Sequence, residues 1–400
     1  MPAAAHVIDL TRLVSRQGHG TLTGIDRVEL AWLSHLLTLD TPLYALVRTP
    51  AGCLVLPRDG ARAVQDMALG RVVPDRPDLI SRLTRRRNPA RGRAEAHLRA
   101  LALARLPLAW LVRGLRRHLP AGAVYLNLGH SNLTAPMLMA LGRAGLRRWV
   151  MIHDCIPLDF PQFSRADAPA AFAAKLAAVS AHADRVIHLS HATRAGTEAH
   201  LSRLGRVPDG VVAPLGITVA APDPDALPPG LDLTTPYFVA LGTIEPRKNL
   251  SLLLDVWDRL AVQGNPPRLF VLGSRGWAGA ELLARLDARP KGVTELTGLS
   301  DGAVSALMRG ARALLFPSRA EGFGLPPIEA AALETPVMCS DLPVIREILS
   351  DYPVYLNPDD IYSWQETIMT YVGRDTQKAQ VTKPVLPDWQ QHFRNVLTSA

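Results

Sequence analysis

Residues 237–264 read YFVALGTIEPRKNLSLLLDVWDRLAVQG, and this stretch decides the fold class. A short apolar run ends at Gly242, and a helical spacing of apolar residues follows Asn249, an expected N-cap. The alternation continues in RLFVLG before GAELLARLDA and in VTELTG before SDGAVSALMRGA, where Ser300 is the expected N-cap. Short strands that alternate with helices are typical of βαβ units. Residues 237–384 are therefore predicted to form a doubly wound, Rossmann-like α/β domain.

The first half of the chain shows a similar alternation. Its apolar runs are HVIDL, AVYLNL, RWVMIH, RVIHLS and GVVAPL, with helical patterns between them. Residues 1–216 are therefore predicted to form another Rossmann-like domain with a parallel sheet. Residues 217–236 hold five prolines and no periodic pattern, which indicates a linker. Two such domains would face a central cleft at the carboxyl ends of their strands, where open α/β sheets bind ligands.

Composition excludes several classes of protein. A chain of 400 residues that is 48% hydrophobic and 20% charged is too long for one ordinary core and is neither disordered nor fibrous. Cys53, Cys155 and Cys339 are odd in number and widely spaced, so neither a disulfide framework nor a cysteine metal site is expected. Asp9 interrupts the apolar N-terminal run and no apolar stretch reaches about eighteen residues, so we expect neither a signal peptide nor a membrane span. These features predict a cytoplasmic protein.

Positive charge is concentrated in residues 82–117. This segment holds eleven arginines and one acid, Glu95, around the apolar stretch LALARLPLAWLV, which is predicted to be helical. Arginines beside an apolar helix with a tryptophan suit an anionic bilayer, so peripheral contact with the inner face of the cell membrane is one interpretation. The other is a helix docked on its own domain with solvated arginines. The basic residues are not interleaved with aromatic ones, so nucleic acid is not an expected partner.

Gly242, Arg247 and Lys248 lie at the turn between the first strand and the first helix of the second domain. Arginine supplies a fork of donors and lysine a compact charge, and together they suit a diphosphate. An adjacent arginine and lysine on a protein surface are usually just solvated. Because this pair is expected at the mouth of the cleft, we interpret it as an anion site. The D-x-D match at Asp223–Asp225 lies in the linker and away from any strand end, so no metal is expected to hold the phosphates.

The stretch EGFGLPPIEA, residues 321–330, predicts a turn that approaches a ligand. Gly322 and Gly324 let the backbone come close to a bound group. Pro326 and Pro327 fit the first turn of a helix, where backbone N–H groups have no partner within the helix.

Two glutamates flank this turn. The amides of residues 323–325 would form an anion site at the helix N-terminus. Glu329 is expected in the first helical turn, where it either binds a sugar hydroxyl or complements the helix dipole. Glu321 precedes the turn and would meet whatever the phosphate carries.

Further candidates lie in the first half. His153 and Asp154 end a buried strand in MIHDCIPLDFP. A lone histidine is more often structural, but one at the carboxyl end of a strand in an α/β sheet points toward the cleft, so His153 is a functional candidate. The loop RQGHGTLTGIDRVE places Gly18, Gly20 and Gly24 after the first strand. Its GxGxxxG spacing is a poor dinucleotide fingerprint, but such a loop suits close approach to a phosphate or a sugar.

These motifs together resemble a known family. The stretches FVALGTIEPRKNLSLLLDVW, LFVLGSRGW, LTGLSDGAVSALMRGARALLFPSRAEGFGLPPIEAAALETPV and HDCIPLDFP are similar to the group 1 (family 4) glycosyltransferases, above all to bacterial mannosyltransferases of surface-polysaccharide synthesis. The likeness is dense from about Tyr237 to Leu356. It implies the GT-B fold, with residues 385–400 forming a helix that crosses back onto the first domain. It also implies retaining transfer of a sugar from a nucleotide-diphosphate sugar without a metal or cofactor.

The resemblance also implies roles for single residues. Glu321 and His153 would be catalytic. The remaining roles are contacts to the donor: diphosphate (Arg247, Lys248, Gly242, Gly20, Gly24), sugar (Glu321, Gly322, Phe323, Gly324, Leu325) and nucleoside (Glu329, Gly273, Leu299). GDP-mannose is the first candidate donor and a UDP-sugar the next, and the acceptor would be a saccharide or a polyprenyl-linked saccharide.

Other functions fit the same pattern. A GT-B nucleotide-sugar epimerase would convert its substrate without an acceptor. A non-catalytic adaptor on a membrane would bind a nucleotide and transfer nothing. An NAD-dependent oxidoreductase also has alternating strands and helices, but the chain lacks a proper glycine fingerprint.

Overall fold

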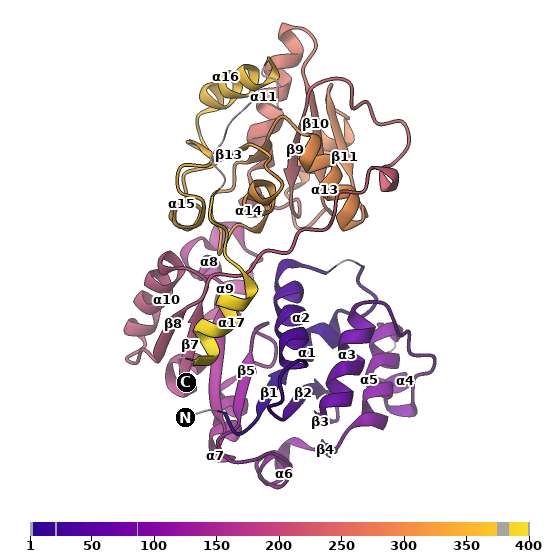
Figure 1. Ribbon diagram of the computed structural model, residues 1–400, viewed down its shortest axis with the longest axis vertical. Helices are drawn as coiled ribbons and strands as arrows, with labels where there is room; N and C mark the ends of the chain where they lie inside the picture. The colour runs from indigo at the N-terminus through magenta and orange to yellow at the C-terminus, as the bar shows by residue number, and fades with distance from the viewer. Residues whose placement is uncertain (1–2, 21, 86, 374–383, 399–400) are drawn as a thin grey trace.

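The computed structural model describes residues 3–20, 22–85, 87–373 and 384–398, and consists of two α/β domains joined end to end (Figure 1). Within the described residues, one domain is built on an eight-stranded sheet and the other on a six-stranded sheet. The domains lie one above the other in Figure 1, with the N-terminal domain below. The predicted architecture of two Rossmann-like domains is confirmed.

The first sheet has the strand order β4-β3-β2-β1-β5-β6-β7-β8. Strands β1, β2 and β5 to β8 are parallel, whereas β3 is antiparallel to both β2 and β4. Its strands are β1 (His6–Asp9), β2 (Leu43–Thr49), β3 (Gly52–Leu56), β4 (Ala104–Leu106), β5 (Val124–Asn127), β6 (Arg147–Ile152), β7 (Arg185–His188) and β8 (Asp209–Val212).

The second sheet is parallel throughout and has the order β11-β10-β9-β12-β13-β14. This is the Rossmann order 3-2-1-4-5-6. Its strands are β9 (Tyr237–Leu241), β10 (Arg268–Leu272), β11 (Val293–Leu296), β12 (Leu314–Phe316), β13 (Val337–Ser340) and β14 (Val354–Leu356).

Helices cover the sheets in both domains (Figure 1). In the first domain they are α1 (Thr11–Ser15), α2 (Gly24–Leu36), α3 (Arg58–Ala68), α4 (Leu79–Thr84), α5 (Pro89–Leu101), α6 (Leu111–His118), α7 (Ala135–Arg143), α8 (Ile156–Asp159), α9 (Ala168–His182) and α10 (His191–Arg203). The remaining helices are α11 (Leu250–Gln263), α12 (Ala280–Asp287), α13 (Asp301–Gly310), α14 (Leu325–Ala332), α15 (Pro343–Leu349), α16 (Ile361–Val372) and α17 (Trp389–Thr398).

The unit from β9 to α11 follows the predicted pattern. Helix α11 buries Leu253 and Trp257 completely against the sheet, which is the face that the helical spacing defines. The expected cap at Ser300 is confirmed, because its hydroxyl accepts a hydrogen bond from the amide of Ala303. Asn249 occupies the N-cap position of α11, as expected, but its side chain makes no capping hydrogen bond. Asn249 adopts a left-handed conformation with φ of 52° and donates its side-chain amide to the carbonyl of Pro358 instead.

Two expectations for the first domain are wrong. Its sheet is not wholly parallel, because β2 and β3 form an antiparallel hairpin and β4 extends it. The stretch LALARLPLAWLV is not one helix, since it contains the end of α5, the strand β4, a short 3₁₀ turn and the start of α6. Leu106 is buried in β4 opposite Cys53, and Pro107 cannot donate the backbone hydrogen bond that a continuing helix needs.

None of the described helices has the length and apolar character needed to cross a membrane.

The predicted linker is held against the second domain. The amide of Asp223 donates to the carbonyl of Gly302, and Asp232 forms an ion pair with Arg268. The chain crosses between the domains nearer to Ile217, whose amide donates to the carbonyl of Pro387 on the returning segment. The outgoing and returning crossings therefore lie side by side.

The last helix, α17, returns to the first domain, as expected (Figure 1). Phe393 is buried there and stacks on His35 with ring centroids 3.9 Å apart. The indole N–H of Trp32 donates to Nε2 of His392. Nδ1 of His392 therefore carries the proton and donates to the carbonyls of Ala213 and Pro214.

His392 should make stability depend on pH. Burial lowers its pKa to about 4, so between about pH 6.5 and 4 the unfolded chain binds a proton that the folded chain does not. The free energy of unfolding is therefore unaffected by this proton above about pH 6.5. Below that pH it falls as the pH drops, by up to about 1.4 kcal/mol per pH unit. We expect His392→Gln to flatten the acid side of a plot of unfolding midpoint against pH. His118→Gln on α6 is the control, and equal slopes for both variants would contradict the assignment.

Candidate active site

The candidate site is built at the carboxyl ends of two neighbouring strands, β9 and β12. Arg247 and Lys248 end a 3₁₀ turn, η4 (Pro246–Lys248), that follows β9. Glu321 follows β12. The amide of Arg319 donates to the carbonyl of Arg247, which joins the two loops directly. Residues 73 positions apart therefore meet at one edge of the sheet.

Glu321 forms ion pairs with both cations. Its carboxylate oxygens lie 2.7 Å from Lys248 Nζ and 2.7 Å from an Arg247 guanidinium nitrogen. Arg247 also pairs with Glu245 and donates to the carbonyl of Ala320. The side chain of Glu321 is 8% exposed and those of Arg247 and Lys248 are 17% exposed. The cluster is therefore largely shielded from water.

Electrostatics keep this cluster charged. Burial alone would raise the pKa of Glu321, but Lys248 and Arg247 outweigh burial and hold it at about 2. Burial and the charge of Arg247 lower the pKa of Lys248, against the opposing attraction of Glu321. The pKa of Arg247 is raised because Glu321 and Glu245 more than offset its burial. Glu321 is thus the ion-pair partner of two cations, and the arrangement of these two cations is the one expected for binding an anionic group.

The first domain contacts this cluster through His153 and Asp154. A Cβ atom on Gly322 would lie 2.6 Å from the carbonyl oxygen of His153 and 2.9 Å from a carboxylate oxygen of Asp154. Only glycine leaves room for this approach between the domains. Burial raises the pKa of Asp154, the charge of Arg247 opposes that rise, and Glu321 adds to it. The turn after β12 and the end of β6 thus form one site.

The imidazole of His153 is buried in the first domain. Nε2 donates to the carbonyl of Leu128 across 2.6 Å, and the ring packs edge-on against His130. Burial lowers the pKa of His153 to about 4. His153 is therefore a neutral, fixed side chain whose backbone carbonyl is the part that adjoins Gly322.

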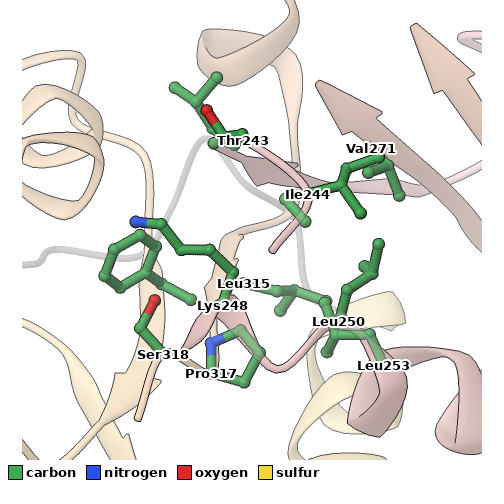
Figure 2. A pocket seen from close by; sticks show the side chains of 13 residues that line it. Thr243, Ile244, Lys248, Leu250, Leu253, Val271, Leu315, Pro317 and Ser318 are labelled. Atoms are coloured by element: carbon green, nitrogen blue, oxygen red, sulfur yellow. The ribbon is translucent and has the colours of Figure 1, made fainter. Parts of the chain in front are cut away.

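A small cavity of about 30 Å³ lies beside Lys248 (Figure 2). Gly242 lines it, and Gly242 and Gly273 touch where β9 and β10 end. Lys248 passes over the ring of Phe316 with Nζ 4.7 Å from its centroid. The buried hydroxyl of Ser318 lines the same cavity and has no hydrogen-bond partner among the described residues. The cavity is large enough for one water molecule.

Helix α14 begins where the glycine and proline pattern predicts. Gly324 precedes it with φ of 84°, and prolines occupy its first turn. The expected position of Glu329 in that turn is wrong, because Glu329 is the fifth residue of α14 and the first turn holds no acid. Since dipole effects fall off beyond the first turn, complementing the helix dipole is not a sufficient role for it.

Arg27 of the first domain forms an ion pair with Glu329. The Arg27 guanidinium lies 3.2 Å from Glu329 and 2.7 Å from Asp301 of α13. Burial raises the pKa of Glu329, Arg27 lowers it, and Asp301 adds to the rise. This bridge links α2 to the second domain beside the start of α14.

Among the described residues of the glycine loop, Gly24 reaches the same boundary. Gly24 is the first residue of α2, and a Cβ atom there would lie 3.3 Å from Leu325 of the second domain. Gly20 adopts φ of 79° and is exposed. Phe323 is buried in the core, so only its backbone is available to a ligand, and Leu299 is half-buried before Ser300. The roles predicted for these residues stay predictions.

Three residues of the site, Arg27, Asp301 and Glu245, were not predicted from the sequence. Arg27 and Glu329 are 302 residues apart, and no local pattern indicates such a pair. The TGIDRVE continuation of the glycine loop is the only sequence signal that could have drawn attention to Arg27.

Comparison with known proteins identifies the second domain. Residues 227–380 match the family model of glycosyl transferases group 1. The chain contains a group 1 glycosyltransferase domain. That domain carries Arg247, Lys248, Glu321 and Glu329, so the cluster described above belongs to it.

Curated proteins named as mannosyltransferases are similar in sequence to this chain. The chain is 31% identical over 238 residues to the serotype-specific mannosyltransferase WbdA of Escherichia coli, which covers 54% of this chain and 29% of that protein. It is 38% identical over 137 residues to the O-antigen chain mannosyltransferase RfbU of Salmonella typhimurium, covering 33% and 37%. The chain spans only 28% to 39% of the length of the curated relatives it matches.

Solved structures share the whole fold. Anabaena HepE, crystallised with UDP and glucose, superposes with a TM-score of 0.56 at 14% identity and covers 94% of this chain and 92% of its own. The fold is therefore GT-B, as the motif resemblance implied.

Proposed function

We propose that the protein transfers a hexose, with mannose as the first candidate, from a nucleotide-diphosphate sugar to a saccharide or polyprenyl-linked acceptor. Transfer would retain the anomeric configuration and need no metal. The relatives named mannosyltransferases support the sugar, and their O-antigen names support a role in surface-polysaccharide synthesis. GDP-mannose is the first donor to test, and a UDP-sugar the second.

One observation carries the proposal. Arg247, Lys248 and Glu321 converge at the carboxyl ends of β9 and β12, and Gly322 brings His153 and Asp154 of the other domain against them. Loss of a nucleoside diphosphate builds negative charge on the leaving oxygen, which fixed cations stabilise best where water is excluded. Two largely buried cations at a domain boundary would supply this stabilisation without a metal.

Donor binding would require an exchange of ion pairs. Glu321 holds Arg247 and Lys248 at 2.7 Å each, so an incoming diphosphate must take those contacts over. The released carboxylate would then lie beside the donor sugar, next to Gly322. There it could stabilise positive charge that develops on the reacting carbon.

The nucleoside would be bound by Glu329. A carboxylate accepts hydrogen bonds from two neighbouring hydroxyls, which is the pattern that a ribose offers. Because Arg27 occupies Glu329 and Asp301 here, the ribose would compete with a contact between the domains. Nucleotide binding and domain separation are thereby coupled.

A transfer assay tests the proposal. Purified protein in EDTA is given GDP-mannose or UDP-glucose, with and without nitrophenyl α-mannoside as acceptor, and the product is analysed by NMR. We expect acceptor-dependent release of the nucleoside diphosphate from one donor and an α-linked product. Conversion of the donor without an acceptor would indicate an epimerase. Binding without any turnover, tested also with lipid-linked acceptors, would indicate an adaptor.

A further inference from the structure

A second cavity lies in the first domain, away from the Arg247 cluster. It has a volume of about 550 Å³, within the range of ligand-binding pockets. Its walls are the loop after α1 and, between α4 and the first turn of α5, residues 83–85, 87–88 and 91. Five basic side chains line it: Arg16, His19, Arg85, Arg87 and Arg91.

Buried acids hold most of these cations in place without neutralising all of them. Glu95 is fully buried and lies 2.8 Å from Arg85 and 2.8 Å from Arg91. Asp26, also buried, is shared by Arg16 and Arg12. Asp26 thus serves two guanidinium groups, and Glu95 serves three because Arg99 also lies 3.8 Å from it, which leaves the cavity positively charged.

Arg87 adds to this charge. It is exposed at the cavity and forms no ion pair with any described residue. Arginine forks bind phosphate oxygens in pairs, so a cavity with several arginines favours phosphate over a single carboxylate.

Both walls of the cavity are held in a fixed position. Gly18 has φ of 82°, and a Cβ atom on it would lie 2.7 Å from the Cβ atom of Ala90 in α5. The loop therefore packs directly on α5. Helix α4 lies beside α5 at the edge of the domain (Figure 1). Asp78 caps α4 and also forms an ion pair with Arg99.

Exposed apolar side chains lie on α4 and just before it, and one of them lines the cavity. Leu83 lines the cavity and is 69% exposed, while Leu79 on the same helix is 75% exposed and Val73 before it is 72% exposed. A cationic pocket beside exposed apolar groups matches an amphipathic ligand, whose head is anionic and whose tail is hydrocarbon.

We propose that this cavity binds a phosphate group carried on a lipid. The side chains of Leu79 and Leu83 would contact the hydrocarbon of that lipid or of the surrounding bilayer. If the sugar is transferred to a lipid-linked molecule, the bound lipid phosphate would be part of the acceptor. This role of the lipid rests on the proposed function. Asp26 lies on α2 and forms an ion pair with Arg16 of the cavity. The next residue on α2, Arg27, forms an ion pair with Glu329 at the domain boundary.

Vesicle flotation tests the proposal. The probes are vesicles of phosphatidylcholine alone and vesicles that also contain phosphatidic acid, with glycerol phosphate as a soluble competitor. We expect the protein to float only with phosphatidic acid, and Arg87→Gln to weaken binding about fivefold. Leu79→Ser with Leu83→Ser should weaken vesicle binding but leave glycerol phosphate binding unchanged. Arg203→Gln, an exposed arginine on α10, is the matched control.

Three results would overturn the proposal: equal flotation with both vesicles, no flotation with either, or an equal loss from Arg87→Gln and Arg203→Gln. Competition by glycerol phosphate with no effect of the leucine variant would indicate a site for free phosphate instead of a lipid. The transfer assay separates this inference from the proposed function. Sugar transfer to a soluble acceptor without vesicle binding refutes the lipid site alone. Vesicle binding without transfer from any donor refutes the function and leaves the lipid site in place.

Discussion

Replacing Arg247 and Lys248 together by alanine is expected to abolish turnover. Both cations lie at the carboxyl end of β9, where the diphosphate of the donor would bind, and both are largely buried. Loss of one preorganised electrostatic contact to a leaving group typically lowers kcat by about 10²–10³-fold. We expect a fall of at least about 10³-fold for the pair, measured as initial rates of nucleoside diphosphate release.

Stability must be separated from catalysis in this experiment. Without its two partners Glu321 becomes a buried, unpaired charge, which costs about 3–5 kcal/mol. A triple variant that adds Glu321→Gln removes this charge and should fold while remaining inactive. Arg285→Ala, which breaks two ion pairs between α12 and α11 of the same domain, is the control. Turnover near the wild-type rate in the double variant would refute the proposed stabilisation of the leaving group.

Glu321→Gln alone is expected to change binding and turnover in opposite directions. In the structure Glu321 occupies both cations, so neutralising it removes a competitor of the diphosphate. A hydrogen bond to a charged group contributes about 1.5–3 kcal/mol, so the affinity for a free nucleoside diphosphate should rise about tenfold or more. Turnover should fall by about 10²-fold or more, because the carboxylate beside the donor sugar is lost.

Calorimetric Kd values and kcat together distinguish this exchange from a simple binding role. If Glu321→Gln weakened nucleotide binding as well as turnover, Glu321 would hold the donor and would not compete with it. Glu295→Gln, which disrupts an ion pair with Arg275 at the edge of the same sheet, should leave both quantities unchanged.

Local sequence patterns predicted much of the second domain. The run at β9, the spacing of leucines in α11, and the prolines that begin α14 each act within a few residues, and the parallel sheet follows from their alternation. The ion pairs of Arg247 and Lys248 with Glu321, by contrast, depend on the strand order, because the two loops are 73 residues apart and meet only where β9 and β12 are neighbours.

The remaining features depend on contacts that sequence spacing does not encode. Strand β4 is three residues long and lies inside an arginine-rich segment, so its pairing with β3 decides its structure. The hairpin of β2 and β3 did have a signal, two apolar runs separated by Pro50 and Gly52, which was overlooked. Arg27 meets Glu329 only because the two domains face each other.

We propose that the largely buried cations Arg247 and Lys248 hold the donor diphosphate without a metal. The decisive experiment is calorimetric titration of the purified protein with GDP, UDP, ADP and dTDP in EDTA. We expect saturable binding of one nucleotide in EDTA, with a preference that names the donor class. Binding that appears only after Mg²⁺ is added would contradict the role of Arg247 and Lys248, and no binding under either condition would contradict the proposed function itself.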